Sequence, residues 1–551
     1  MKYRVRIILF FIVCVAAAVR FIGLGSVPPS PDWDEAALGY NAWSIVQTGR
    51  DEYGEWFPLI FRSFDDYKPG LYVYLAIPSI LLFGLTTFAV RFPSAIIGVF
   101  AVWATYSLVS HMSHERYKQY GEKIGLWAAF FMAISPWHVQ FSRIAFEASV
   151  GMAFTIFGTL YFLKGLRKSW HWYLTAIFYA LAIYVYQSEK VFIPLLMMCL
   201  VIVYWRTLLS FRQKLIGPAM VFLVIAVPFY WQTLSDPDAL LRAKGVSLFA
   251  DQTPYLSRTV ERLQRDEAAG DVLGKILDNR RVTYAVGFAR SYISHFDLNW
   301  LFISGDQARH QPPEFGHLYF FELPLILIGV YMLIYGTFDR RAKLLIILWL
   351  IVTPIPASIT TGTPHPIRTI HFLPGIHILS AIGVVALIHW IGCIKRSPMF
   401  KWVAFGVLGI CAAGNSAYYL VQYSVQYAYA SSQEWQYGYE EAVPFVSSVA
   451  SDYDRIVVSN QDPLGQSYIF FLFYMKYDPA SYISGGGSET GGFAERHSFG
   501  KYEFRPIDWN AEQIPGRTLY VGRPVDFPGN IPAVKTIYYL DGSPAILVVE
   551  R

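Results

Sequence analysis

The chain has 551 residues, of which 54% are hydrophobic and only 15% charged, and its mean hydropathy is +0.35. Because soluble globular domains carry about 25% charged residues, this composition excludes an ordinary soluble protein. The formal net charge of +5 comes from Lys and Arg scattered over many short loops, so nucleic acid is not an expected partner.

Apolar runs recur along the first 420 residues, and most are long enough to cross about 30 Å of hydrocarbon as helices. The first run is long for a secretory signal and lacks a small-residue cleavage site, so we expect an uncleaved first span. Twelve runs can be counted. If Leu71–Leu85 lies along the membrane interface instead of crossing, the clusters of Lys and Arg all fall on one side, as the positive-inside rule prefers.

We therefore predict a multi-pass α-helical protein of the cell membrane with about eleven transmembrane helices. The predicted spans are 5–24, 88–110, 124–136, 148–165, 171–186, 190–207, 214–234, 317–337, 343–358, 370–392 and 401–421.

This topology predicts a transmembrane domain over residues 1–421, with outer loops 25–87 and 235–316, and an extracytoplasmic region over residues 422–551. In the last region "EEAVPFVSSVA" has the pattern of an amphipathic helix. The segments "DRIVVSN", "RTLYVG" and "PAILVVE" have the pattern of short buried strands. The C-terminal region is therefore predicted to be a small α/β domain.

Three carboxylates stand within four residues just after the first span, in "PDWDEAALGYNAWSIV". Apolar residues then recur at helical spacing, so Asp32 or Asp34 could cap a helix and favour its positive end. A carboxylate at the edge of hydrocarbon is partly desolvated, which raises its proton affinity, as a general base requires. The stretch is thus predicted to be either a helix cap or a catalytic base.

More charged residues fall on the same predicted face. Lys68, in "YKPGLYVYL", either reaches lipid headgroups or awaits a phosphate, and Arg91 opens the next span on that side. Glu147, in "SPWHVQFSRIAFEAS", either caps the following span or pairs with Arg143 four residues earlier. Later outer segments add two cations, Arg309 and Arg368.

The order of these motifs carries a resemblance. An acidic DE pair after the first span, then "KPGLYVYL", "FAVRFPSAIIGV" and "SPWHVQFSRIAFEAS", resembles membrane-embedded glycosyltransferases of the C-type fold, in the protein O-mannosyltransferase and aminoarabinose transferase superfamily. The resemblance is strongest over residues 28–165. It implies an enzyme that takes a sugar from a polyprenyl-phosphate donor on the extracytoplasmic side and passes it to a protein, lipid or glycan acceptor. "YKPGL" is closer to the aminoarabinose branch than to the "HPPLG" of the mannosyltransferases, and the identity of the acceptor does not follow from either branch.

The resemblance also implies roles for single residues. The family's DE aspartate falls on Asp34, its lipid-phosphate lysine on Lys68, and the arginine after its interfacial helix on Arg91. Its second acidic position falls on Glu147, where several relatives carry Asp. The expected catalytic residues are Asp34, Glu35 and Glu147, and the expected cations for the donor phosphate are Lys68, Arg91, Arg143, Arg309 and Arg368.

The chemistry of a single displacement fits these residue types. A base removes the acceptor proton, and the leaving polyprenyl phosphate needs cations more than a general acid. We expect Asp34 to be the base, Glu35 to assist it and Asp32 to be the cap. No nucleotide-binding motif and no metal-type cysteine spacing is present, and the participation of a divalent cation stays open. The alternatives are a transporter or flippase of lipid-linked sugars, or a non-catalytic sensor, although the inverted repeats and mid-span charges typical of transporters are not seen.

Overall fold

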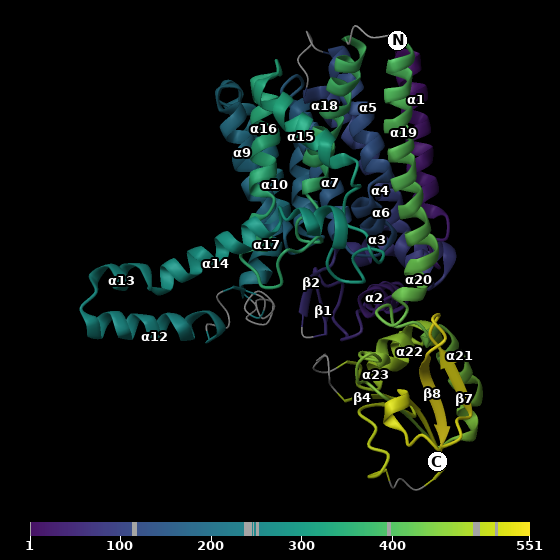
Figure 1. Ribbon diagram of the computed structural model, residues 1–551. Helices are drawn as coiled ribbons and strands as arrows, with labels where there is room; N and C mark the ends of the chain where they lie inside the picture. Colours follow the sequence, from purple (N-terminus) through teal and green to yellow (C-terminus); the bar gives the residue numbers. More distant parts are fainter. Residues whose placement is uncertain are drawn as a thin grey trace.

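The computed structural model describes most of the chain, in residues 2–64, 66–112, 118–235, 245, 247–248, 253–393, 398–488, 496–512 and 516–551. Long helices run side by side as a bundle, with the N-terminus at one end and the C-terminal region beyond the other (Figure 1). We call the end of the bundle that faces the C-terminal region, opposite the N-terminus, the C-terminal end of the bundle. Part of the predicted loop 235–316 lies outside the described residues.

Each of the predicted spans coincides with one helix of this bundle. Within the described part of the chain, seven helices are long and apolar enough to cross a membrane, and others, including α8 and α15, are apolar but shorter. The protein is therefore a multi-pass membrane protein, while the exact number of crossings stays a prediction. The bundle helices are α1 (Lys2–Phe21), α4 (Thr87–Met112), α5 (Lys118–Ile134), α7 (Ala148–Gly165), α8 (His171–Ile183), α9 (Glu189–Ser210), α10 (Arg212–Ser235), α15 (Glu322–Tyr335), α16 (Arg340–Val352), α18 (Phe372–Cys393) and α19 (Pro398–Val421).

The segment that the charge pattern placed at the interface forms a separate short helix, α3 (Leu71–Phe83), at the C-terminal end of the bundle. It packs against α4 and against α2 (Trp33–Thr48). A helix of 13 residues is about 20 Å long, which is less than the roughly 30 Å of a hydrocarbon core. Its length therefore fits the interfacial placement.

Several small elements gather at the same end of the bundle (Figure 1). An antiparallel hairpin pairs Phe61 with Lys68. A short helix between α5 and α7 and another after α16 fill the space between the long helices. These elements are β1 (Ile60–Ser63), β2 (Asp66–Pro69), α6 (Pro136–Arg143) and α17 (Ile355–Ser358).

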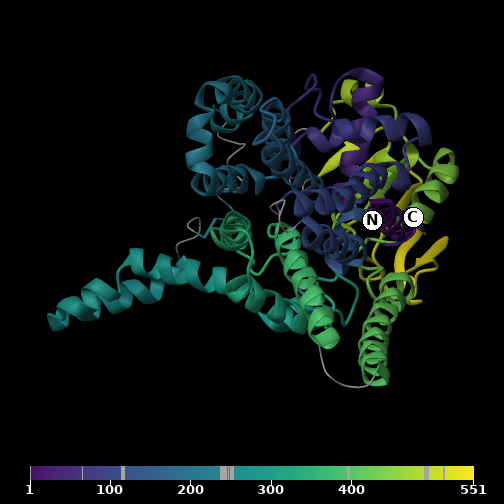
Figure 2. The ribbon, with the colours of Figure 1, turned by 90° about the horizontal axis from the view of Figure 1, so that it is seen from above.

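The long segment between α10 and α15 contains an arm of three helices. Figures 1 and 2 show it projecting sideways from the C-terminal end of the bundle. The arm consists of α12 (Thr253–Ala269), α13 (Val272–Leu277) and α14 (Arg280–Ser294), and the π-helix Trp300–Ser304 follows it.

The C-terminal region contains a six-stranded sheet with the strand order β4-β5-β3-β6-β8-β7, in which β3 is parallel to both of its neighbours. The predicted helix and all three predicted strands are confirmed, as α21, β3, β6 and β8. The elements are α20 (Tyr427–Ala430), α21 (Tyr439–Val449), β3 (Arg455–Val458), α22 (Ser467–Met475), α23 (Pro479–Ser484), β4 (His497–Phe499), β5 (Tyr502–Phe504), β6 (Thr518–Gly522), β7 (Lys535–Tyr538) and β8 (Pro544–Glu550).

The C-terminal region is packed onto the bundle rather than suspended from it. Helix α22 contacts both α21 and α2, and a continuous set of buried side chains runs from Trp137 in the bundle through Tyr40 to Phe470. The helix α19 passes through a π-turn, Gln422–Gln426, directly into α20. The predicted boundary at 421–422 thus falls within a continuous helical segment, and the division into two domains stays a prediction.

Candidate active site

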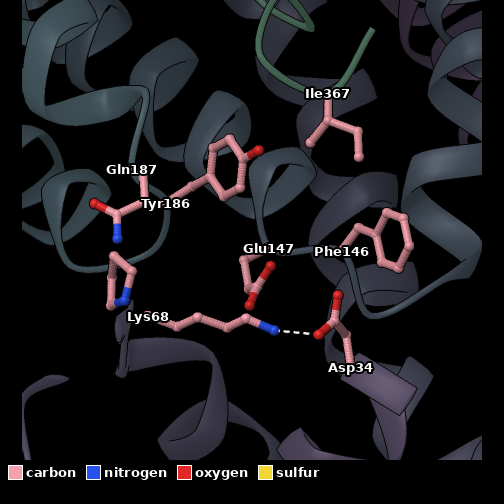
Figure 3. Close-up of a pocket in the computed structure, with 8 residues that line it drawn as sticks. Asp34, Lys68, Phe146, Glu147, Tyr186, Gln187 and Ile367 are labelled. Atoms are coloured by element: carbon pink, nitrogen blue, oxygen red, sulfur yellow. Dashed lines mark hydrogen bonds and ion pairs between the residues drawn. The ribbon is translucent and has the colours of Figure 1, made fainter. Parts of the chain in front are cut away.

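The site begins at the first turn of α2. Asp32 is the N-cap residue: its carboxylate accepts a hydrogen bond from the backbone N–H of Glu35 at 2.9 Å. The Glu35 carboxylate in turn accepts one from the backbone N–H of Asp32 at 3.4 Å, which completes a capping box. Asp34 lies between them in the first turn, where the helix dipole favours a carboxylate. The sequence thus places the cap on Asp32 and leaves the Asp34 side chain to face the pocket (Figure 3).

Glu35 and Arg91 form a fully buried ion pair behind this turn. The guanidinium of Arg91 donates to the two carboxylate oxygens of Glu35 at 2.8 and 2.7 Å. It also donates to the backbone oxygens of Leu24, Pro28 and Ser30. The backbone N–H of Ala145 donates to Glu35 at 2.8 Å. This pair joins the first loop, α4 and the turn before α7. Neither residue lines the pocket, although the sequence suggested Glu35 as a catalytic residue and Arg91 as a cation for the donor phosphate.

Arg143 also lies away from the pocket. Its guanidinium donates to five backbone oxygens at the end of α1 and in the following turn, at 2.6 to 3.1 Å. A cation at this position satisfies carbonyls that a helix C-terminus leaves without partners. The expected i,i+4 pair with Glu147 does not form, because α6 ends at Arg143 and α7 starts only at Ala148. In this arrangement Arg143 anchors the end of the first helix and does not line the pocket.

The hairpin β1–β2 carries Lys68 to the pocket, where its ammonium forms an ion pair with Asp34 (Figure 3). The Gln187 side chain holds the hairpin by donating to the backbone oxygen of Tyr67 at 2.5 Å. Gly70 follows directly, and a Cβ at this position would lie 2.6 Å from the Phe61 ring, so the tight return of the chain requires glycine. The fixed hairpin therefore places the Lys68 ammonium against the Asp34 carboxylate.

These residues open onto a pocket of about 70 Å³. Figure 3 shows Glu147 on its wall between Asp34 and Tyr186, with Lys68 below. Glu147 precedes α7 and makes no side-chain capping bond, so its carboxylate remains available to the pocket. The pocket is lined by Asp34, Lys68, Pro69, Phe146, Glu147, Tyr186, Gln187 and Ile367.

The carboxylates and the ammonium at this pocket shift one another's proton affinities. Burial raises the pKa of the Glu147 carboxyl to about 7, with smaller contributions from Asp34 and Asp32, although the ammonium of Lys68 opposes the shift. Burial also raises the pKa of Asp32 to about 7. For Lys68, burial favours the neutral amine, but the carboxylates of Asp34 and Glu147 outweigh it and raise its pKa. Near neutral pH the pocket thus contains a charged lysine and a carboxyl that is close to its titration point.

The remaining two predicted cations lie at the margins. Arg309 pairs with the Asp32 carboxylate at 3.3 Å, and its guanidinium stacks 4.1 Å from the centre of the Trp33 ring. Arg368 donates to the Thr360 hydroxyl at 2.5 Å and to a neighbouring backbone oxygen, and it interacts with the phenol of Tyr186 in the pocket wall. Neither arginine lines the pocket, but Arg368 contacts the lining residue Tyr186, and Arg309 pairs with Asp32, two residues before Asp34.

Five pocket residues were not predicted, and one of them, Pro69, directly follows Lys68. Phe146 precedes Glu147 in the same motif, and Ile367 precedes Arg368. Tyr186 and Gln187 stand in "YVYQSEKVF", where the charged Glu189 and Lys190 drew attention instead. Their position in the sequence could have identified them: Tyr186 and Gln187 stand just before a predicted span, at the same membrane surface as the carboxylates.

Two further observations bear on what the pocket holds. Among the described residues, no group of three or more His, Cys, Asp or Glu side chains is arranged to hold a metal ion. A larger cavity, of about 380 Å³, includes Tyr120, Asp339 and Trp390 in its wall, but none of the lysines and arginines whose side chains are described lines it. Its Asp339 carboxylate is engaged in capping α16. A phosphate therefore has charge complementarity with the small pocket rather than the large one.

Comparison with known proteins agrees with the predicted resemblance. The family described as dolichyl-phosphate-mannose-protein mannosyltransferase matches residues 67–231. No curated protein sequence matches the chain. ArnT from Cupriavidus metallidurans in the apo state is 12% identical and superposes with a TM-score of 0.53 over 98% of this chain and 97% of that protein. The same ArnT bound to undecaprenyl phosphate gives a TM-score of 0.52 over the same shares of both chains, again at 12% identity.

The archaeal oligosaccharyltransferase AglB from Archaeoglobus fulgidus, in complex with an inhibitory peptide and a dolichol-phosphate, is 13% identical with a TM-score of 0.51. The match covers 86% of this chain but only 64% of AglB. The chain therefore has the C-type glycosyltransferase fold, as the order of its motifs predicted, with a small C-terminal sheet region.

Proposed function

We propose that this protein is an integral-membrane glycosyltransferase that moves a sugar from a polyprenyl-phosphate donor to an extracytoplasmic acceptor, with Asp34 as the base. The observation that carries this proposal is the meeting of Asp34, Lys68 and Glu147 at an open pocket at one end of a membrane bundle. A cation beside two carboxylates is a sufficient set for displacement from a phosphate leaving group.

In the proposed mechanism Lys68 binds the donor phosphate. Its ammonium is paired with Asp34, so an incoming phosphate competes with that carboxylate for the same cation. Once the phosphate takes the ammonium, Asp34 loses its counter-ion and its proton affinity rises. Donor binding therefore converts Asp34 from an ion-pair partner into a base, which prevents the base from acting before the donor is in place.

The transfer itself is a single displacement. The acceptor oxygen gives its proton to the Asp34 carboxylate and forms a bond to the anomeric carbon. The bond between that carbon and the phosphate oxygen breaks, and the electron pair leaves on the polyprenyl phosphate next to Lys68. The configuration at the anomeric carbon is inverted. Glu147, with a pKa raised to about 7 by burial, supplies a partly protonated carboxyl that holds a sugar or acceptor hydroxyl in place.

The comparisons support a lipid phosphate as the ligand of this fold, since ArnT has been solved with undecaprenyl phosphate and AglB with a dolichol-phosphate. The described residues of this pocket supply one cation directly and two more, Arg309 and Arg368, at its margins. We include these two as helpers that stabilise the charge on the departing phosphate.

The proposal is tested with the full chain purified into liposomes and offered a panel of polyprenyl-phosphate hexoses and pentoses, with cell-envelope extract as the acceptor. Release of polyprenyl phosphate is measured for the wild type and for Asp34→Asn. We expect the wild type to consume at least one donor and Asp34→Asn to consume none above background. Movement of intact donor across the bilayer without release of polyprenyl phosphate would contradict the proposal and favour a flippase.

A further inference from the structure

The arm formed by α12, α13 and α14 has no counterpart in the proposed chemistry. It leaves the C-terminal end of the bundle and runs sideways from it (Figures 1 and 2). Its root is fixed to the bundle, because the Tyr292 hydroxyl of α14 donates to the backbone oxygen of Ile351 near the end of α16 at 2.8 Å. The arm thus starts at the depth at which a membrane-spanning helix ends.

The arm has two layers. Figure 1 shows α12 on the side of α13 and α14 that points away from the bundle, and Figure 2, seen from above the bundle, shows a single arm. Two contacts fix which faces meet. A Cβ at Gly274 of α13 would lie 2.5 Å from the Asp266 carboxyl carbon of α12, and the hydroxyls of Thr259 and Thr283 lie 2.9 Å apart.

Helical geometry then identifies the residues on the opposite face. At about 100° per residue, Val272 and Ile276 lie roughly 160° around α13 from Gly274. By the same count, Phe288 and Tyr292 lie within about 40° of the direction opposite Thr283 on α14. The rings of Phe288 and Tyr292 are 6.1 Å apart, centre to centre. We call these four residues the arm face, and it is directed toward the plane of the membrane.

On the arm face Val272 and Ile276 are exposed, while Phe288 and Tyr292 are half-buried. The six-residue helix α13 exposes Val272, Leu273, Ile276 and Leu277, and α14 and the turn after it expose Val286, Ile293 and Phe296. By contrast, Val260 is the single large apolar side chain that is exposed among the described side chains of α12. Exposing these apolar side chains to water is unfavourable, and aromatic rings such as those of Phe288 and Tyr292 are typical of residues at the membrane interface.

The charges are divided in the same way. Residues 272–294 carry four basic residues and one acidic residue, a net charge of +3, whereas α12 carries three of each sign. Arg280, Arg281 and Arg290 are all exposed, and by the same count Arg281 lies within about 20° of the direction opposite Thr283, whereas Arg280 and Arg290 lie within about 60° of Thr283 itself. An amphipathic segment with an apolar face flanked by arginines binds in the headgroup region of a membrane that contains anionic lipid.

We propose that the arm face docks on the leaflet at the C-terminal end of the bundle, with its apolar side chains in the headgroup–acyl boundary and Arg281 beside anionic lipid phosphates. Docked in this way, the arm holds the long loop, and with it Arg309, at a fixed depth beside the pocket. This inference does not depend on the proposed transferase activity.

The test uses the full chain in liposomes that contain anionic lipid. The native Cys14, Cys199, Cys393 and Cys411 are replaced by serine, and a single cysteine at Ile276→Cys is labelled with an environment-sensitive fluorophore. The matched control is Gln264→Cys on α12, which is exposed but lies on the layer away from the membrane. Lipids brominated on their acyl chains quench fluorophores that enter the bilayer.

We expect strong quenching at position 276 and at least several-fold weaker quenching at position 264. In the Ile276→Cys background, Arg281→Glu should reduce the quenching in anionic liposomes, whereas the parent background should retain it. Equal and weak quenching at both positions would overturn the inference. Shielding of position 276 from aqueous iodide without quenching by brominated lipid would also overturn it, because the face would then be covered by protein, such as a second copy of the chain.

Discussion

Replacement of Asp34 by asparagine separates the two roles that the structure gives to this side chain. Asparagine preserves the size of the residue in the first turn of α2, while the capping box of Asp32 and Glu35 is untouched. The substitution removes the base, and general-base assistance is worth roughly 10²- to 10⁴-fold. Turnover of donor and acceptor should fall by about that factor.

The same substitution should tighten the binding of the donor phosphate. In the wild type a phosphate must displace Asp34 from the Lys68 ammonium, and the side chains of this pair are 32% and 13% exposed, respectively. Ion pairs with such exposure contribute about 0.2–1 kcal/mol. Without that competition the affinity for polyprenyl phosphate should rise by roughly 1.5- to 5-fold.

The assay pairs single-turnover transfer with equilibrium binding of polyprenyl phosphate to the reconstituted protein. Asp32→Asn is the control, because asparagine still caps α2 and both transfer and binding should stay close to those of the wild type. The reasoning is refuted if Asp34→Asn weakens phosphate binding, or if transfer continues at a rate near that of the wild type. If Asp32→Asn and Asp34→Asn exchange phenotypes, the base is Asp32.

Three other predictions concern the surroundings of the pocket. Arg91→Met should lower the free energy of unfolding by about 3–5 kcal/mol, because it leaves the buried Glu35 without its ion-pair partner. The double variant Arg91→Met with Glu35→Gln should regain part of that stability, as measured by thermal unfolding. Burial raises the pKa of Glu147 from 4.5 to about 7, so ionising this carboxyl in the folded protein costs free energy. As the pH rises from 4.5 to 7, the melting temperature of the wild type should therefore fall relative to that of Glu147→Gln. A constant difference between the two melting temperatures across this window would contradict the assignment. Glu52 accepts hydrogen bonds from Asn41 at 2.9 Å and from Ser488 of the C-terminal region at 3.2 Å. Glu52→Ala should therefore lower the free energy that holds this region on the bundle by about 1–3 kcal/mol and make the region more susceptible to limited proteolysis. An unchanged cleavage pattern would argue against this link.

The membrane helices could be predicted from the sequence because a span has to satisfy one strong requirement. Its residues must be apolar over the thickness of the bilayer, whatever their neighbours are, so local composition reveals them. The short run Leu71–Leu85 was separated from the spans by the charges of distant loops, and α3 is indeed a short helix. The strands around Ile456 and Val548 were readable for a similar reason, since buried strands in a compact region show short apolar runs.

The partners of the charged residues could not be predicted in the same way. A sequence shows that Arg91 and Lys68 stand near a membrane surface, but the choice between a carboxylate and a phosphate depends on which groups the fold brings together. The structure pairs Arg91 with Glu35 in a buried position, and it pairs Lys68 with Asp34 beside an open pocket. Arg143 illustrates the same point, because its five carbonyl partners come from a helix end more than 110 residues earlier.

The central claim is that the Lys68 ammonium binds the phosphate of a lipid carrier, and the most direct test is the equilibrium affinity of the reconstituted protein for polyprenyl phosphate. Lys68→Met is compared with the wild type and with Lys190→Met, a matched loss of charge at the start of α9 outside the pocket lining. A hydrogen bond to a charged group contributes about 1.5–3 kcal/mol, so Lys68→Met should weaken binding roughly 10- to 100-fold. Lys190→Met should bind like the wild type. Unchanged affinity in Lys68→Met, or an equal loss in both variants, would contradict the claim.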